Sequence, residues 1–271
     1  MRTRNVMSII VGWILVFFSA SAGAWSIGSD FDSQAIGSAC TPFWDGNYDS
    51  TISSDRGSSG SQSCRMKVTN GGSTWGGGMD LTGDLQTGDE IWIRLRTYAP
   101  AGFSTYVAPS RGGKLKFIRI TERSSSGTPA RLDWYWPNRV ILERDDVWQY
   151  PNSGYDMTTG VWETWEMYVM FDKNSVDNGG TGRVRLWKNG TLIGDLTARG
   201  TLWSDATRVV DVRIFDHWNG GAPQTQHLYL DDLVVTNDPP STTDSAGNRY
   251  IGMGSFVAAV RPLPPSSILT Q

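Results

Sequence analysis

The residues best suited to chemistry in this sequence are its two histidines, together with tyrosines, arginines and lysines on the same predicted strands. Side chains alternate between the two sides of a β-strand. Taking the apolar positions of each run as the buried side leaves one set of polar residues facing outward. This outward set consists of Lys114, Lys116, Arg131, Tyr135, Arg213, His217, His227 and Tyr229.

An outward face that combines cations, histidines and tyrosines suits an anionic sugar chain. Arg and Lys pair with the carboxylates of such a chain, and aromatic rings stack on its pyranose faces. The alternative interpretation is that these are ordinary exposed positions on unrelated strands. A strand boundary displaced by one residue would invert the alternation on which the set depends.

The alternation also predicts which neighbouring residues are buried. Lys114 and Lys116 follow the pattern, but Arg119 breaks it, and we expect a β-bulge there. In the run from Asp211 to His217, Phe215 is predicted to face outward with Arg213. The residues predicted to face the core are Leu132, Trp134, Trp136, Val212, Ile214, Leu228 and Leu230.

Carboxylates near the two ends of the predicted domain could hold a cation. Asp231 and Asp232 lie in the last predicted strand, Asp30 and Asp32 lie near the first, and first and last strands often pair in sandwiches. Clustered carboxylates with backbone carbonyls could bind Ca²⁺. Asp32 and Asp231 are therefore predicted as a possible structural calcium site, with an ordinary acidic pair on an edge strand as the alternative. No organic cofactor is expected.

The segments that must position these residues are all predicted to be β-strands. Runs rich in β-branched and aromatic residues alternate with turns of Gly, Asn and Asp, and no long window has helical periodicity. Asn189–Gly190 favours a type I′ hairpin after the strand Arg183–Lys188. The pattern predicts an all-β fold, a two-sheet antiparallel jelly-roll sandwich. The predicted strands are Ser63–Val68, Glu90–Thr97, Lys114–Thr121, Arg131–Trp136, Trp162–Phe171, Gly182–Lys188, Val209–Asp216 and His227–Thr236.

Composition excludes several classes of protein. The 271 residues carry a net charge of −3, and a weakly acidic chain lacks the basic surface that a nucleic-acid binder needs. Two histidines and two cysteines are too few for a zinc cluster of the usual kind. A hydrophobic content of 39% excludes a mostly disordered chain.

The first 24 residues are predicted to be a signal peptide. Arg2 and Arg4 precede the apolar run Ile9–Phe18, and the ending Ala22-x-Ala24 fits a signal-peptidase site. The run is about half the roughly 20 residues of a spanning helix, although an uncleaved N-terminal anchor remains the alternative. The protein is therefore expected to be secreted or periplasmic, with no membrane contact after cleavage.

Export predicts that the two cysteines are oxidised, and removal of the signal peptide sets the start of the domain. Cys40 and Cys64 are the only cysteines, and in an oxidising compartment such a pair is expected to form a structural disulfide. The jelly roll is expected over residues 25–236. Residues 237–271 read as a linker and tail, of which Ile251–Val260 is apolar enough to pack back on the domain.

Two stretches of the chain resemble a known family. The run Gly160–Val169, followed by Gly182–Gly190 with its Trp187-Lys188-Asn189-Gly190 ending, resembles concanavalin A-like jelly-roll polysaccharide lyases and glucanases, including the heparin-lyase and alginate- and glucuronan-lyase groups. The ending Tyr229–Val235 is similar to their closing strand. The similarity covers roughly residues 90–236 and consists of scaffold motifs. The glutamate-x-aspartate-x-x-glutamate signature of the glucanases is absent, as are the Gln-Ile-His and Arg-(Ser/Thr)-Glu motifs of the best-known alginate lyases.

The resemblance implies β-elimination on a uronic-acid polymer. A cation neutralises the C6 carboxylate, a base removes the C5 proton, and an acid protonates the departing O4. We expect Arg213 or Lys116 as the neutralising cation, His217 or His227 as the base, and Tyr229 or Tyr135 as the acid. Lys114 and Arg131 are expected to bind substrate. The alternative is a non-catalytic carbohydrate-binding jelly roll; in both cases the partner is an anionic polysaccharide.

Overall fold

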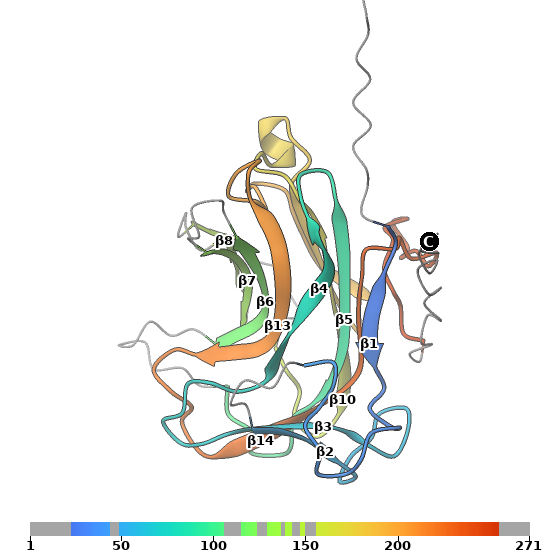
Figure 1. Ribbon diagram of the computed structural model, residues 1–271, viewed down its shortest axis with the longest axis vertical. Helices are drawn as coiled ribbons and strands as arrows, with labels where there is room; N and C mark the ends of the chain where they lie inside the picture. The colour runs from blue at the N-terminus through green and yellow to red at the C-terminus, as the bar shows by residue number, and fades with distance from the viewer. Residues whose placement is uncertain are drawn as a thin grey trace, which may run out of the picture.

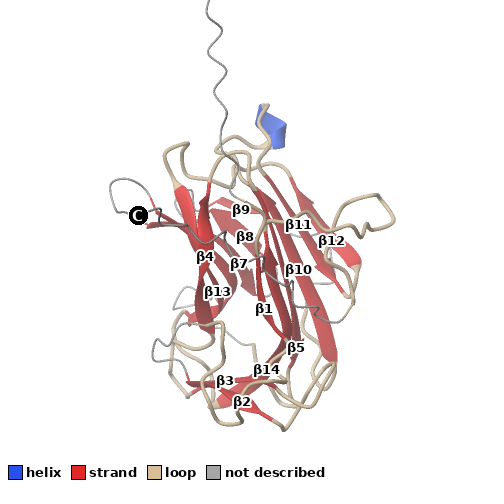
Figure 2. Cartoon of the chain, turned by 45° about the vertical axis from the view of Figure 1, so that its right-hand side comes forward, coloured by secondary structure: helices blue, strands red, loops and turns tan. Residues whose placement is uncertain are grey.

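The computed structural model describes residues 23–43, 49–105, 115–123, 129–136, 139–142, 147–149 and 156–254. It contains two antiparallel sheets that face each other (Figures 1 and 2), so the predicted two-sheet jelly-roll sandwich is confirmed. Lys114, the predicted signal peptide up to residue 22 and the tail from residue 255 lie outside the described residues.

The larger sheet has eight strands. Strand β14 lies inside this sheet, between β5 and β3, and is bent by a bulge, because Asp232 has a φ of 46° and the register with β5 shifts between Asp231 and Val234. In order across the sheet the strands are β12 (Thr191–Leu196), β11 (Arg183–Lys188), β10 (Trp162–Met170), β5 (Glu90–Tyr98), β14 (Gln226–Thr236), β3 (Ser63–Val68) and β2 (Asp49–Ser53), with β1 (Ser26–Ser29) paired to the end of β14.

 

Over its 11 residues, Gln226–Thr236, β14 therefore has two halves with different partners. The first half pairs with β3, and the second half pairs with β1, while β5 lies along both. Figures 1 and 2 show β14, β3 and β2 together at one end of the sandwich. The bend separates the end of the eight-stranded sheet near His227 from the rest of that sheet.

The second sheet has six described strands. Its order is β4 (Gly77–Leu85), β13 (Arg208–Trp218), β6 (Leu115–Arg123), β7 (Pro129–Trp136), β8 (Arg139–Leu142) and β9 (Val147–Gln149). One short 3₁₀ helix, Val176–Asn178, lies between β10 and β11. The hairpin between β11 and β12 turns at Asn189 and Gly190, whose φ values of 49° and 76° confirm the predicted type I′ turn.

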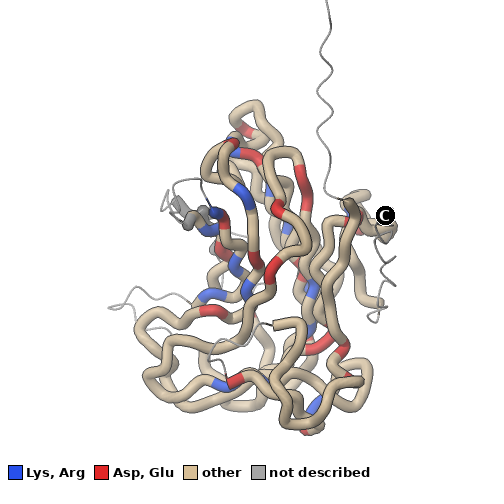
Figure 3. Tube along the Cα trace, viewed as in Figure 1, with Lys and Arg blue, Asp and Glu red and all other residues tan. Residues whose placement is uncertain are grey.

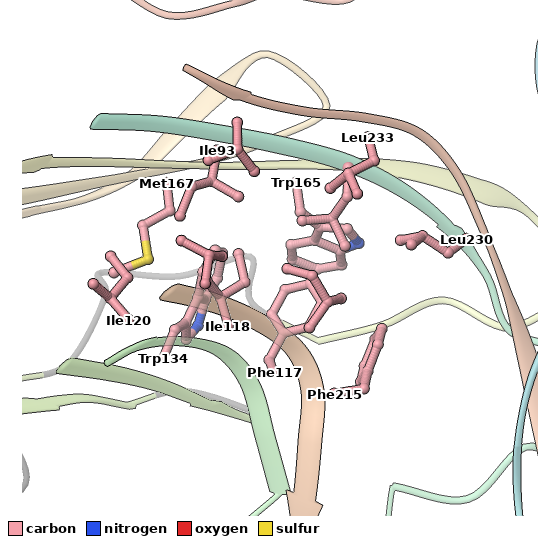
Figure 4. Packing of buried hydrophobic residues seen from close by; sticks show 14 of the residues in the cluster. Ile93, Phe117, Ile118, Ile120, Trp134, Trp165, Met167, Phe215, Leu230 and Leu233 are labelled. Carbon is pink, nitrogen blue, oxygen red and sulfur yellow. The ribbon is translucent and has the colours of Figure 1, made fainter. Parts of the chain in front are cut away.

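Aromatic and aliphatic side chains from both sheets fill the space between them (Figure 4). The ring of Phe117 lies 5.0 Å from those of Trp134 and Phe215 and 5.7 Å from that of Trp165. Leu132, Trp134, Val212, Ile214, Leu228 and Leu230 are all buried, as the alternation predicts. The side chain of Trp136 lies outside the described part.

One orientation from the sequence is wrong: Phe215 is fully buried in the core. The register of β13 against β6 shifts between Ile214 and His217, and Phe215 has a φ of 53°, so a bulge turns this ring inward. Gly76 approaches the bulge so closely that a Cβ on it would lie 2.1 Å from the carbonyl oxygen of Ile214. The bulge expected near Arg119 is confirmed, because the β6–β7 register shifts between Lys116 and Ile118.

The disulfide between Cys40 and Cys64 is confirmed, with the two Cα atoms 5.8 Å apart. It ties the loop before β2 to β3. Among the residues that the structure describes, no helix is long and apolar enough to cross a membrane.

Candidate functional site

The outer face of the six-stranded sheet brings together five of the predicted site residues. His217 on β13 lies directly opposite Lys116 on β6, and Lys116 lies directly opposite Tyr135 on β7. The Lys116 ammonium is 5.9 Å from the centre of the Tyr135 ring. We call this cross-strand set of His217, Lys116 and Tyr135 the six-stranded row. Arg213 and Arg131 occupy the same face in the rows that follow.

An ion-pair network lies directly beside the six-stranded row. The Arg119 guanidinium donates to both carboxylate oxygens of Asp133, at 2.7 and 2.8 Å, and to Asp216 at 2.7 Å. Arg213 donates to Asp211 at 3.0 Å and to the second oxygen of Asp216 at 3.3 Å. Figure 3 shows the basic and acidic positions gathered where β6, β7 and β13 run side by side. Arg119 and Arg213 are therefore each held by two carboxylates of the protein.

The electrostatics of this face keep His217 unprotonated at neutral pH. Partial burial lowers the pKa of His217, and the positive charges of Lys116, Arg119 and Arg131 lower it further, whereas Asp216 opposes them. A neutral imidazole has a lone pair that can accept a proton. The row therefore places a proton acceptor, an ammonium group and a phenol on three adjacent strands.

His227 and Tyr229 do not join this row, because they lie on β14 in the other sheet. Their inward neighbours Leu228 and Leu230 belong to the core, so the two side chains face away from it. His227 Nε2 and the Tyr229 hydroxyl are 3.1 Å apart, and that hydroxyl also donates to Asp55 at 3.3 Å. Burial lowers the pKa of His227 and raises that of Tyr229. The two histidines thus serve different surfaces.

The carboxylates considered for calcium act as acceptors for a loop. Asp32 accepts the N–H groups of Ser61 and Gln62 at 2.8 and 3.0 Å, and Asp231 accepts that of Ser58 at 2.7 Å. N–H donors aimed at a carboxylate are the reverse of what a cation needs there. Within the described ranges, no group of three or more His, Cys, Asp or Glu side chains is arranged to hold a metal ion.

Asp231 has an unusual environment all the same. Its burial raises the pKa of the carboxyl to about 7, with the nearby charges of Asp232 and Asp32 adding to the effect and hydrogen bonds from the backbone N–H groups of Ser58 and Asp232 opposing it. Asp232 forms a 3.0 Å ion pair with Arg96. These acidic residues fasten the loop around Ser58 to the sheet.

The sequence did not single out the buried Arg119 network. Asp133 was not among the candidate site residues, and Arg119 was noted only as a break in the pattern. The sequence feature that could have revealed the network is an arginine and an aspartate in the middle of two adjacent predicted strands. A charge buried there is costly unless it is paired. Asp216 reaches the same face only through the β13 bulge.

Comparison with known proteins supports the fold. No family model and no curated protein matches the chain. Among solved structures, the alginate lyase Aly36B, as a double mutant in complex with an alginate trisaccharide, superposes with a TM-score of 0.53 at 17% identity over 78% of this chain and 97% of that one. The cellulose induced protein Cip1 superposes with a TM-score of 0.54 at 15% identity, over 84% of this chain and all (100%) of the other.

Identities this low establish a shared fold and leave the activity to be argued from the site itself. Two facing antiparallel sheets are what the strand motifs implied. The chain has a two-sheet jelly-roll fold similar to those of Aly36B and Cip1.

Proposed function

We propose that the protein is a polysaccharide lyase that cleaves a uronic-acid-containing polysaccharide by β-elimination on the outer face of the six-stranded sheet. The observation that carries the proposal is the six-stranded row, in which His217, Lys116 and Tyr135 are direct cross-strand neighbours. Adjacent strands are about 4.8 Å apart, so the row spans roughly 10 Å, which is the scale of a short sugar segment. Solved structures with this fold include an alginate lyase with bound alginate.

His217 is the base in this proposal. Its pKa is lowered by burial and by the neighbouring cations, so the imidazole is ready to accept the C5 proton at neutral pH. The same cations that lower the pKa favour the approach of a polyanion. Their charge therefore serves both the base and the binding of substrate.

Lys116 is the cation that neutralises the C6 carboxylate. The C5 proton becomes acidic enough to remove only when the charge that develops next to it is stabilised. Lys116 lies directly opposite both His217 and Tyr135, so its ammonium group is the cation placed between the proposed base and the proposed acid. Arg131, two outward positions further along β7, would bind a neighbouring uronate.

Tyr135 is the acid. When His217 takes the C5 proton, the C5–H electrons form the C4–C5 double bond and the C4–O4 bond breaks. Tyr135 donates its phenolic proton to O4, so the leaving sugar departs as an alcohol. His217 and Tyr135 then return to their first protonation states by exchange with solvent, and the reaction needs no organic cofactor and no bound Ca²⁺.

A non-catalytic carbohydrate-binding role is the second candidate. The observation in its favour is that Tyr135 is only 1% exposed, whereas an acid must reach the oxygen that it protonates. A binding protein would use the same cations and rings to hold the polymer without a proton transfer.

The decisive experiment uses the two histidines as a matched pair. The purified protein is incubated with alginate, glucuronan, heparin-type and pectic polymers, and the ultraviolet absorbance of the new C4–C5 double bond is followed. We expect His217→Ala to lower the rate by about 10²–10⁴-fold, and His227→Ala to leave it near the wild-type value.

Loss of elimination in His227→Ala with retention in His217→Ala would move the active site to the eight-stranded sheet and overturn the assignment. No absorbance change with any polymer, together with retention of the protein on an immobilised polymer, would establish the binding role. Tyr135→Phe and Tyr229→Phe provide the same comparison for the acid.

We also propose that the protein acts outside the cell or in the periplasm. The Cys40–Cys64 disulfide fits an oxidising compartment. A polymeric substrate would be met there.

A further inference from the structure

The outer face of the eight-stranded sheet carries a second row of aromatic and basic side chains. Trp162 on β10 lies directly opposite Tyr98 on β5, Tyr98 lies opposite Tyr229 on β14, and Tyr229 lies opposite Arg65 on β3. We call these four residues the eight-stranded row. Cross-strand partners share one face of a sheet, so the row runs across four adjacent strands over roughly 15 Å.

The three rings are tilted relative to one another, and Trp162 and Tyr98 are the two that keep exposed surface, because Tyr229 is only 5% exposed. The ring centres of Trp162 and Tyr98 are 5.7 Å apart with planes at 53°, and those of Tyr98 and Tyr229 are 6.2 Å apart with planes at 64°. A flat crystalline polymer would require coplanar rings. Tilted rings instead suit a single soluble chain whose sugar units turn relative to one another.

Basic side chains flank the rings. The Arg56 guanidinium lies 4.8 Å from the centre of the Tyr98 ring, and Arg65 and Lys67 follow one another along the outer side of β3. Arg65 pairs with Asp55 at 3.5 Å and Lys67 with Asp49 at 2.9 Å, and all four side chains are at least 40% exposed. Exposed pairs of this kind contribute little to stability, so a carboxylate of a ligand can replace the aspartate at small cost.

A pocket continues from the row. It has a volume of about 210 Å³ and is lined by the Pro100–Phe103 loop, by Gln224–Gln226 and by His227, the residue bonded to Tyr229. Ligand pockets for drug-sized molecules are about 300–1,000 Å³, so this one suits a smaller group such as one sugar ring. The amides of Gln224 and Gln226 bond each other and the backbone of Gly102 and Ser104, which holds the wall of the pocket in place.

The rest of this outer face is covered by the chain itself. Ile251 and Gly252 donate their N–H groups to Glu166, Arg94 donates to the carbonyl of Gly252, and Tyr250 stacks on Trp187. The segment reaches Arg96, which donates to Met253. Over the described residues it therefore lies on β5, β10 and β11 beyond the eight-stranded row, whose Trp162 and Tyr98 keep part of their surface exposed.

We propose that the eight-stranded row is a second saccharide-binding surface, which holds a single anionic polysaccharide chain on the sheet opposite to the proposed catalytic row. Trp162 and Tyr98 provide stacking surface, Arg65, Lys67 and Arg56 bind uronate carboxylates, and the pocket beside His227 receives a terminal sugar unit. The substrate class follows from the proposed function, but the binding surface is independent of it. Such a surface would keep the protein on its polymer between cleavage events.

The test measures binding without turnover. All variants are made in a His217→Ala background, and their retardation in native gels containing alginate or polygalacturonate is measured, with hydroxyethylcellulose as the neutral polymer. We expect Trp162→Ala and Arg65→Ala each to weaken binding about tenfold, which corresponds to about 1.4 kcal/mol. Retardation by the anionic polymers is expected to fall with added salt.

Two substitutions elsewhere serve as controls. Trp203→Ala removes a tryptophan that is 36% exposed, and Lys173→Ala removes an exposed lysine that pairs with Asp205. Both are expected to leave retardation unchanged. Arg65→Ala removes only an exposed ion pair and is expected to fold normally, so the test does not depend on the partly buried Trp162.

Unchanged retardation in both Trp162→Ala and Arg65→Ala, or no retardation of the starting protein by either anionic polymer, would overturn the second surface. Failure of the catalytic proposal would give a different result. The protein would then show no elimination, but the polymers would still retard it, and Trp162→Ala and Arg65→Ala would still weaken that retardation. With an active enzyme, Trp162→Ala should raise KM for long polymers and leave kcat on short oligosaccharides unchanged.

Discussion

At the scale of single residues, the two histidines show how one residue type acquires different roles. His217 lies among Lys116, Arg119 and Arg131, while His227 is bonded to Tyr229 and lies near Arg65, Asp55 and Lys67. Burial lowers the pKa of both rings. Only the neighbours distinguish them, and those neighbours come from other strands and so from distant parts of the sequence.

The environment of His217 predicts how the proposed activity depends on pH. A base must be unprotonated, so activity falls when the pH drops through its pKa. Because burial and the cations lower the pKa of His217, the acidic limb of kcat/KM should lie below the usual value of about 6.5. A pH–rate profile of elimination measures it.

His227→Ala is the control for this profile and should leave the limb in place. An acidic limb well above pH 6.5 would contradict the assignment of His217 as the base.

At the scale of strands, the alternation of side chains predicted the position of most strands and which of their residues face the core. The strand Ser63–Val68 was predicted to the residue, and Leu132, Trp134 and Leu228 are buried as expected. The sequence predicts no strand at β4, because Gly77 and Gly78 at its start lack the side chains that are typical of strands.

The division of the outward residues between two sheets could not be predicted from single strands. Alternation says that Tyr229 and Tyr135 face away from the core, but it does not say which sheet contains each strand. The bulge at Phe215 is likewise set by its partners on β6 and by the close approach of Gly76. Both depend on contacts between segments far apart in the chain.

The ion-pair network also belongs to this scale, because it joins three strands. Arg119 lies on β6, Asp133 on β7 and Asp216 on β13, and Arg119 and Asp133 are almost fully buried. Asp133→Ala removes two of the three hydrogen bonds of the Arg119 guanidinium and leaves Asp216 as its remaining carboxylate partner. We therefore expect this substitution to lower the free energy of unfolding, but by less than the about 3–5 kcal/mol that a buried charge without any partner costs. Urea denaturation measures the loss.

Asp205→Ala is the matched control, since Asp205 pairs with Lys173 at the surface and its loss should matter little. Equal stability of the two variants would show that the network does not hold the strands together.

At the scale of the whole molecule, the sandwich exposes one broad face and closes part of the other. On the outer face of the six-stranded sheet Arg131 and Arg213 keep part of their surface exposed, whereas Lys116 and Arg119 are buried. The segment around Ile251 covers the β5–β10–β11 part of the eight-stranded sheet. Glu166 and Arg94 fasten that segment and are both buried. Burial raises the pKa of Glu166 to about 7, against opposition from the two backbone N–H groups and Arg94.

This buried carboxyl should make global stability depend on pH. In the unfolded chain Glu166 ionises near its usual pKa of 4.5, but in the folded protein it ionises near 7. The neutral Glu166 carboxyl therefore makes its full contribution to stability below pH 4.5, and this contribution is lost as the pH rises through 7.

The variant Glu166→Gln cannot ionise at this position. Its stability relative to the wild type should therefore improve from pH 4.5 to pH 8, by on the order of 1–3 kcal/mol. Thermal and urea unfolding of both proteins across this range measure the difference. A constant difference between wild type and Glu166→Gln would mean that the carboxylate is ionised throughout and that its hydrogen bonds to Ile251 and Gly252 outweigh its burial.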